Sequence, residues 1–152
     1  MDLGINNKVA LVTAASQGLG KASAIELAKE GVKLAICSRD VEKIKKAAND
    51  IKELTNSEVY CIQADLSNKE DIDNLVSHVE KELGNIDILV NNTGGPKAGY
   101  FDELDDSDWV KTFESTFLSA VRVTRKVIPS MKNNQWGRIT NISSISAKQP
   151  ID

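Results

Sequence analysis

Histidine, cysteine and long hydrophobic runs are scarce in this sequence, and each scarcity excludes a class of protein. No apolar stretch approaches the roughly 20 residues of a membrane span, and the N-terminus lacks the basic region and cleavage site of a signal peptide. The two cysteines, Cys37 and Cys61, lie in apolar runs with no second thiol at metal-binding spacing. We therefore expect a reduced, cytoplasmic protein with no membrane partner.

An excess of positive charge is also lacking. The 19 basic and 22 acidic residues give a net charge of −3, and nothing suggests the concentrated basic face that nucleic acids require. The single histidine, His78, lies in a charged amphipathic stretch, where we expect it to be a solvated surface side chain. These features indicate no nucleic-acid partner, no metal site and no Ser/His hydrolase chemistry.

The sequence does contain a regular alternation of short apolar runs and amphipathic stretches. Runs typical of buried strands occur at residues 8–13, 33–38, 58–63, 87–91 and 137–142. Helical spacing of apolar residues occurs at 19–30, 41–54, 68–83 and 107–131. We expect Gly31 to close the first helix, Ser107 to cap the last one and Pro129 to kink or end it.

This alternation predicts an α/β fold with a doubly wound parallel sheet. About five strands and their helices would form three layers, helix–sheet–helix, because parallel strands need long right-handed crossovers. In such a fold, ligands bind beyond the carboxyl ends of the strands, at the place where the strand order reverses. The residues that follow each strand are therefore the candidates for a functional site.

The turn after the first strand, Thr13 to Gly20, gives the clearest indication of a ligand. Gly18 and Gly20 open a helix directly after a buried strand, so a pyrophosphate is able to approach the backbone at the positive end of the helix. Ser16 offers a hydroxyl to a phosphate. The alternative is that the glycines only permit a tight turn and close packing, but the strand–turn–helix context favours a dinucleotide.

Charged residues follow the second and third strands. A guanidinium after the second strand grips the extra phosphate of NADP, whereas an acidic group there pairs with the ribose hydroxyls of NAD. Arg39 stands at that position and Asp40 one residue beyond it, which favours NADP(H) over NAD(H). The alternative is a solvated Arg–Asp pair at the start of a helix. Asp65, after the third strand, either accepts the adenine amino group or caps the next helix.

Amides and hydroxyls follow the last two strands. Asn91 and Asn92, with the glycines after them, either bring main chain against a ribose or form a plain Asx turn. Ser143 and Ser144 end the fifth strand, where a hydroxyl is able to bond a substrate carbonyl. The alternative is that these serines belong to an ordinary serine-rich loop, and their spacing alone favours this alternative.

Together these motifs resemble the short-chain dehydrogenase/reductase family. The resemblance covers essentially the whole chain, and its motifs match in order and spacing. The family's Thr-Gly-x-x-x-Gly-x-Gly turn, its third-strand Asp, its Asn-Asn-Ala-Gly, and its late helix and strand correspond to Thr13–Gly20, Asp65, Asn91–Gly94, the helix from Asp108-Trp109, and Gly137 to Ser144.

The resemblance implies a Rossmann-type enzyme that transfers hydride between a nicotinamide and a small ketone or secondary alcohol, as 3-oxoacyl reductases do. It implies that Ser144 bonds the substrate carbonyl as a catalytic residue. It also implies a homodimer or homotetramer formed through the 107–131 helix, where Phe113, Phe117 and Val121 make an apolar stripe that could equally face the chain's own sheet. The residues implied to line the dinucleotide are Ala14, Ala15, Ser16, Gln17, Gly18, Leu19, Arg39, Asp65, Leu66 and Asn92.

Three features depart from the family pattern. Ala14 replaces the first glycine of the turn, Thr116 stands where the family has an Asn in the long helix, and the acid/base Tyr-x-x-x-Lys is expected beyond Asp152. We therefore expect residues 1–152 to be one dinucleotide-binding domain, incomplete at its C-terminus and inactive alone, with the 137–142 strand as an unpaired edge.

Two other interpretations of the function remain open at this point. The first is a non-catalytic or regulatory NADP(H)-binding module, which the three departures would suit. The second is a methyltransferase on a similar sheet, which explains neither the amides of Asn91 and Asn92 nor the serines at the end of the fifth strand.

Overall fold

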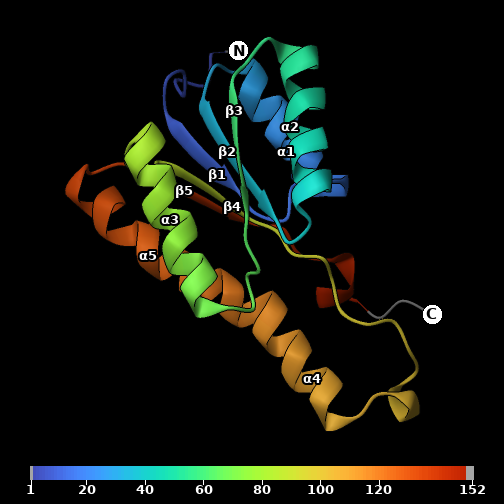
Figure 1. Cartoon of the computed structure of the whole chain (residues 1–152). Coiled ribbons are helices and arrows are strands. Elements are labelled where there is room, and N and C mark those ends of the chain that lie inside the picture. Colours follow the sequence, from blue (N-terminus) through green and yellow to red (C-terminus); the bar gives the residue numbers. More distant parts are fainter. Residues whose placement is uncertain (1, 150–152) are drawn as a thin grey trace.

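Five strands form one parallel sheet in the order β3-β2-β1-β4-β5 (Figure 1). The computed structural model describes residues 2–149. Each strand lies within its predicted range, and the strands are β1 (Val9–Val12), β2 (Lys33–Ser38), β3 (Val59–Gln63), β4 (Ile88–Asn91) and β5 (Arg138–Asn141). The predicted doubly wound α/β architecture is therefore confirmed.

Helices cover both faces of this sheet, which gives the predicted three layers (Figure 1). The helices are α1 (Gly18–Lys29), α2 (Val41–Thr55), α3 (Lys69–Leu83), α4 (Asp106–Thr112) and α5 (Ser119–Asn133). Helices α1 and α2 pack on one face of the sheet, and α3 and α5 pack on the other. A π-helical segment, η2 (Phe113–Leu118), joins α4 to α5, and two short 3₁₀ turns are η1 (Phe101–Glu103) and η3 (Ile145–Ala147).

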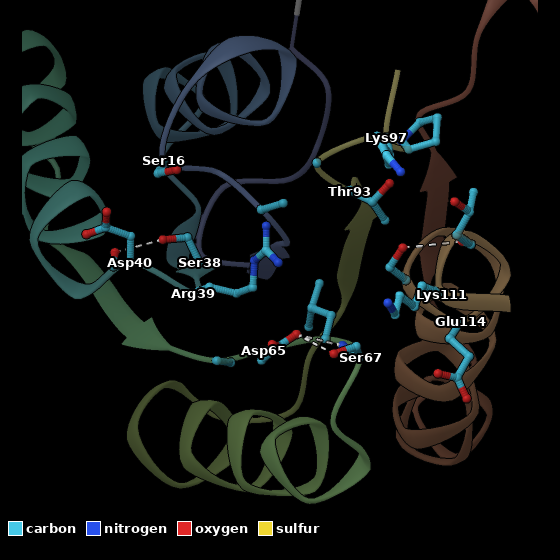
Figure 2. Close-up of a pocket in the computed structure, with 18 of the residues that line it drawn as sticks. Ser16, Ser38, Arg39, Asp40, Asp65, Ser67, Thr93, Lys97, Lys111 and Glu114 are labelled. Carbon is cyan, nitrogen blue, oxygen red and sulfur yellow. Dashed lines mark hydrogen bonds between the residues drawn. The ribbon is translucent and has the colours of Figure 1, made fainter. Parts of the chain in front are cut away.

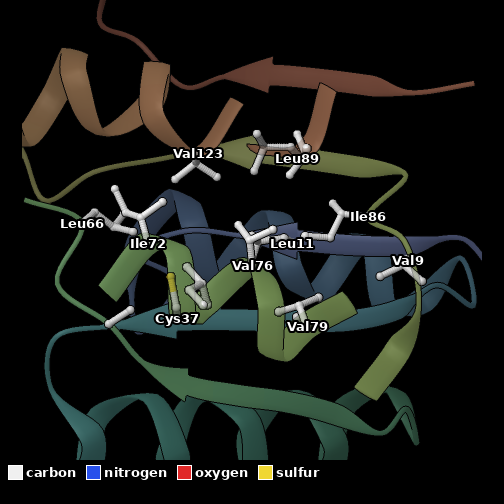
Figure 3. Packing of buried hydrophobic residues seen from close by; sticks show 14 of the residues in the cluster. Val9, Leu11, Cys37, Leu66, Ile72, Val76, Val79, Ile86, Leu89 and Val123 are labelled. Carbon is white, nitrogen blue, oxygen red and sulfur yellow. The ribbon is translucent and has the colours of Figure 1, made fainter. Parts of the chain in front are cut away.

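The inner strands are buried on both faces, which explains why they read as continuous apolar runs. Alternate residues of β1 face opposite layers, so that Leu11 packs toward α3 and α5, and Val12 toward α1 and α2. Figure 3 shows the side chains of Leu11 and Leu89, which belong to β1 and β4, close to those of Val76 and Val123, which belong to α3 and α5. This core holds the carboxyl ends of the strands in register.

The strand order reverses between β1 and β4. From β1 the chain moves outward through β2 to β3, and it then returns to place β4 on the other side of β1. Strand β5 pairs with the outer side of β4, and no strand in the described part of the chain pairs with the other edge of β5. The topology therefore creates a crevice above β1 and β4, where the segments after the strands diverge.

The predicted cap of the last helix is wrong, and the helix runs past Pro129. The helix begins at Asp106 because Asp105 caps it, its carboxylate accepting the N–H of Asp108 at 3.0 Å, and Ser107 lies inside the first turn. Pro129 does not end the helix, since α5 continues to Asn133. Near the helix end, the missing proline N–H removes a single backbone hydrogen bond, which the remaining packing tolerates.

Two of the absences noted in the sequence have structural counterparts. No helix in residues 2–149 is long and apolar enough to cross a bilayer. Neither Cys37 nor Cys61 is in a disulfide, and burial raises the pKa of the Cys37 thiol to about 12, although a backbone hydrogen bond from Ala14 opposes this. Cys37 is therefore a packing residue, uncharged at neutral pH.

Candidate functional site

A cleft of about 600 Å³ opens at the carboxyl ends of the strands. Its walls are the turn after β1, the segments after β2 and β3, the loop after β4, and residues of α4 and η2 (Figure 2). The predicted residues that line it are Ala14, Ser16, Gln17, Arg39, Asp65 and Leu66. The structure thus brings together residues that follow three different strands.

The turn from β1 to α1 needs unusual backbone conformations. Ala14 has φ +47° and Gly18 has φ +59°, both in the left-handed region. Gly20 is required for a different reason, because a Cβ there would lie 2.6 Å from Asn92 Nδ2 and 2.8 Å from the carbonyl oxygen of Ala14. Because its φ is positive, Ala14 carries backbone strain that the family's glycine would avoid.

Asn92 joins this turn to the end of β4. Its backbone N–H donates to Thr13 Oγ1 at 2.8 Å, and the Thr13 hydroxyl donates to the Asn92 carbonyl at 2.7 Å. Its side-chain amide donates to the Ala14 carbonyl at 3.1 Å. Asn92 thus positions the turn and does not itself line the cleft.

The start of α1 differs from the starts of α2, α3 and α4. Those three helices have side-chain caps from Asp40, Asn68 and Asp105, respectively. At α1, within the described residues, the Gln17 side chain makes no capping hydrogen bond and the first turn has no acidic residue. The first backbone N–H groups of α1 therefore lack a side-chain acceptor, an arrangement suited to an anion.

The strain at Ala14 can be measured by replacement with glycine. We expect Ala14→Gly to raise the free energy of unfolding by about 0.5 kcal/mol, because relief of left-handed strain exceeds the added unfolded-state entropy. The matched variant Ala15→Gly should lower it by about 1 kcal/mol or more, since Ala15 is fully buried and its φ is not positive. Urea unfolding followed by circular dichroism compares the two, and equal losses would contradict the expectation.

After β2, the two charged residues have separate roles. Asp40 caps α2, its carboxylate accepting the N–H groups of Glu42 at 3.1 Å and Lys43 at 3.0 Å. The backbone hydrogen bond and the charge of Lys43 hold the pKa of Asp40 below its usual range. Asp40 is therefore an ionised helix cap, and both Asp40 and Arg39 line the cleft (Figure 2).

The Arg39 guanidinium has no ion-pair or hydrogen-bond partner among residues 2–149. Its backbone is held by Gln63, whose side-chain amide donates to the Arg39 carbonyl at 3.0 Å. Its Nη2 atom lies 4.0 Å from the position that a Cβ on Gly94 would occupy. A fixed backbone and an unpaired cationic head leave Arg39 able to bind an anionic ligand.

After β3, Asp65 closes a turn ahead of α3 and does not cap the helix, which Asn68 does. Its Oδ1 accepts the backbone N–H of Ser67 at 2.9 Å and the Ser67 hydroxyl at 2.8 Å. Partial burial raises the pKa of Asp65, but the Ser67 hydrogen bonds and the charge of Arg39 outweigh it, so the net pKa lies below the usual range. Asp65 therefore presents an ionised acceptor to the cleft.

The loop after β4 and the start of α4 supply a wall that the sequence interpretation missed. Lys97 Nζ lies 2.8 Å from Asp108 Oδ2, and this contact raises the pKa of Lys97. No local pattern indicates such a pair, because its members are separated by an irregular loop. The lining residues on this side that were not predicted are Pro96, Lys97, Asp108, Lys111, Thr112, Glu114 and Ser115.

Thr116 and Asn91 make structural hydrogen bonds. The Thr116 hydroxyl donates to the Thr112 carbonyl at 2.6 Å inside η2, so it is used within its own helix. The Asn91 amide donates to Thr124 Oγ1 at 3.0 Å and to Asn141 Oδ1 at 2.8 Å, which connects β4 with α5 and β5. Asn91 is buried and holds the neighbouring elements together.

Several predicted residues do not line the cleft. Ala15 is buried in the core under α1 and α2, and the Leu19 side chain is 65% exposed on the first turn of α1 with Gly18 beside it. Ser144 is exposed at the start of η3, where its oxygen accepts the N–H of Ser146 at 3.2 Å. Ser144 is therefore not among the residues that line the cleft with Arg39.

Residues 8–152 match the model of the family described as short chain dehydrogenase. The chain belongs to the short-chain dehydrogenase family. One relative within it is the dehydrogenase subunit BbsD of Thauera aromatica, which is 34% identical over 142 residues. This match covers 93% of the present chain and 57% of the relative.

Solved structures of this dehydrogenase family have the same fold. L-sorbose reductase from Gluconobacter frateurii, complexed with NADPH and L-sorbose, is 36% identical with a TM-score of 0.93, and the match covers 99% of this chain and 57% of the reductase. A variant of actinorhodin polyketide ketoreductase with NADPH is 33% identical with a TM-score of 0.90, and the match covers 99% of this chain and 58% of that one. The present chain thus spans little more than half the length of these family members.

Residues 2–149 of this short-chain dehydrogenase contain no cluster of three or more His, Cys, Asp or Glu side chains able to hold a metal ion. His78 is exposed on α3, with its Nδ1 atom 2.7 Å from the Asn74 carbonyl oxygen. The groups that do converge are the cationic Arg39, the acceptor Asp65 and the uncapped start of α1.

Proposed function

We propose that this chain is the coenzyme-binding part of an NADP(H)-dependent oxidoreductase, which transfers hydride between the nicotinamide and a ketone or secondary alcohol. The observation that carries the proposal is the arrangement after β2, where Arg39 extends unpaired into the cleft and Asp40 is occupied as a helix cap. A guanidinium that makes no ion pair, next to an acid already used as a helix cap, suits the 2′-phosphate of NADP(H) better than the free ribose of NAD(H). The NADPH in the two similar reductase structures supports the same choice.

The residues present fit such a coenzyme. The pyrophosphate would lie at the start of α1, where backbone N–H groups lack side-chain acceptors and Ser16 adds a hydroxyl. The extra phosphate would pair with Arg39, and Asp65 and Leu66 would hold the adenine. Ala15 would support the turn from the buried core, and Asn92 would support it through the hydrogen bond to the Ala14 carbonyl. Leu19, whose side chain is exposed, would contribute only its backbone.

A bound nicotinamide coenzyme supplies the hydride chemistry, and this chain's residues supply its binding and orientation. On the substrate side, we assign to the Ser144 hydroxyl, at the end of β5, a hydrogen bond to the substrate carbonyl. An acid/base Tyr-x-x-x-Lys pair, expected beyond Asp152, would complete the site in the full protein. A small-molecule ketone substrate of the 3-oxoacyl reductase kind is part of this proposal, and the polyketide ketoreductase among the similar structures supports it.

Titration calorimetry with NADPH and NADH tests this function. We expect the purified protein to bind NADPH more tightly than NADH, and no binding of either at millimolar concentration would refute the proposal. Full-length protein that binds NADPH but lacks Tyr-x-x-x-Lys would instead be the non-catalytic binding module, for which the internal use of the Thr116 hydroxyl is the supporting observation.

We also propose that the protein forms a homodimer or homotetramer through the α4–η2 surface. Phe113 and Phe117 stack with ring centroids 5.2 Å apart and are 52% and 57% exposed, so this part of the apolar stripe faces away from the chain's own sheet. Trp109 is exposed beside them. Exposed aromatic side chains in one patch favour burial against another surface. Sedimentation equilibrium of the purified protein would show a dimer or tetramer, and a monomer would oppose this assignment.

A further inference from the structure

The loop from Asn92 to Tyr100 has neither helix nor strand, and one ion pair ties it to α4. Lys97 Nζ lies 2.8 Å from Asp108 Oδ2. The Asp108 side chain is 16% exposed, whereas that of Lys97 is 61% exposed. The carboxylate is therefore the anchored partner, and the loop lysine is held against it.

Asp108 is anchored because it also takes part in the cap of α4. Its backbone N–H donates to Asp105 Oδ1 at 3.0 Å, and its carboxylate faces the Asp105 N–H at 3.4 Å. The second acid, Asp105, adds to the negative potential at Lys97. The start of α4 therefore offers a rigid acidic attachment point for a loop that has little structure of its own.

The same loop passes near Arg39 a few residues earlier. Arg39 Nη2 lies 4.0 Å from the position that a Cβ on Gly94 would occupy, so the guanidinium faces the loop at this glycine. Between Gly94 and Lys97 lie Gly95, with φ +78°, and Pro96, whose ring restricts its own φ. Only these two residues separate the part of the loop near Arg39 from the lysine.

We propose that Lys97 and Asp108 form a clasp that positions the loop against Arg39 and thereby raises selectivity for NADPH over NADH. This inference rests on the proposed function, and both residues act as positioning residues. With the clasp closed, the guanidinium has a wall on one side before the phosphate arrives, so less side-chain freedom is lost on binding. With it open, the loop moves away and Arg39 samples more rotamers.

The test compares Lys97→Met and Asp108→Asn in the full-length protein with Lys132→Met as the matched control. Lys132 is exposed on α5, does not line the cleft, and its ammonium has no ion-pair partner among the described residues. We expect each clasp variant to weaken NADPH binding about two- to fivefold, the upper range of an ion pair with an exposed partner, and to change NADH binding less than twofold. The charge-exchanged double variant, Lys97→Asp with Asp108→Lys, should recover part of the selectivity.

Hydrogen exchange of residues 93–100 without coenzyme gives an independent readout of the clasp. Faster exchange in Lys97→Met and Asp108→Asn, but not in Lys132→Met, supports the clasp, and unchanged exchange overturns it. Equal loss of NADPH and NADH affinity in the clasp variants also overturns the inference while leaving the proposed function in place. Failure of the unmodified protein to bind NADPH overturns the proposed function, and the selectivity role falls with it.

Discussion

Replacing Arg39 by aspartate is expected to weaken NADPH binding about 100-fold and NADH binding far less. A charge-assisted contact to phosphate contributes roughly 1.5–3 kcal/mol, and the new carboxylate adds repulsion of the 2′-phosphate. NADH has no phosphate at this position, so it loses only minor contacts. Parallel calorimetric titrations of the two coenzymes measure the ratio.

The control for this variant is Arg125→Asp, which makes the same change of charge at an exposed position on α5, away from the cleft-lining residues. It should leave both affinities within about twofold, because exposed charges farther apart than roughly 10 Å are largely screened at ordinary salt. Equal losses for NADPH and NADH in the Arg39 variant would contradict the assignment of Arg39 to the phosphate.

Replacing Gly20 by alanine is expected to lower the free energy of unfolding by about 2 kcal/mol and to weaken coenzyme binding strongly. The added Cβ would lie 2.6 Å from Asn92 Nδ2, 2.8 Å from the Ala14 carbonyl oxygen and 3.1 Å from the Ala15 Cα. Two of these atoms belong to the backbone of the turn, so the turn itself must shift, and this outweighs the roughly 1 kcal/mol that alanine gains in a helix. Urea unfolding and NADPH titration measure the two effects.

Gly18→Ala is the matched comparison within the same turn. Gly18 has φ +59° but nothing within 4 Å of its missing Cβ, so alanine there costs about 1 kcal/mol of conformational strain without a clash. We therefore expect Gly20→Ala to be the more harmful variant for both stability and NADPH affinity. The reverse order would show that close packing does not determine the shape of this turn.

These expectations share one physical cause. The turn after β1 is held from three sides: by its own left-handed residues, by the close approach of Gly20, and by the amide of Asn92 on the Ala14 carbonyl. Ala14 accepts strain at a position where glycine would be relaxed, and neighbouring hydrogen bonds maintain the conformation. A pyrophosphate that binds here meets a backbone already in place, which reduces the entropy lost on binding.

Much of the fold was predictable because it depends on local periodicity. The apolar run around Leu11 predicts a strand covered on both faces, and Ile44 and Ile51 at helical spacing predict the buried side of α2, as the structure confirms. The predicted cap at Ser107 was wrong, and the helix does not end at Pro129. At the first, the neighbouring Asp105 is the acceptor that caps the helix, and at the second, packing continues the helix past a single lost hydrogen bond.

The sequence by itself determined which segments become strands and helices, and it placed Arg39 and Asp65 directly after strands, because burial patterns and strand ends are properties of neighbouring residues. Only the tertiary structure decided that the Asn92 amide binds the Ala14 carbonyl, and that a loop lysine pairs with an acid of α4 in the wall of the cleft. Those features depend on how the crossovers bring separate segments to one edge of the sheet, and no pattern of adjacent residues records that distance.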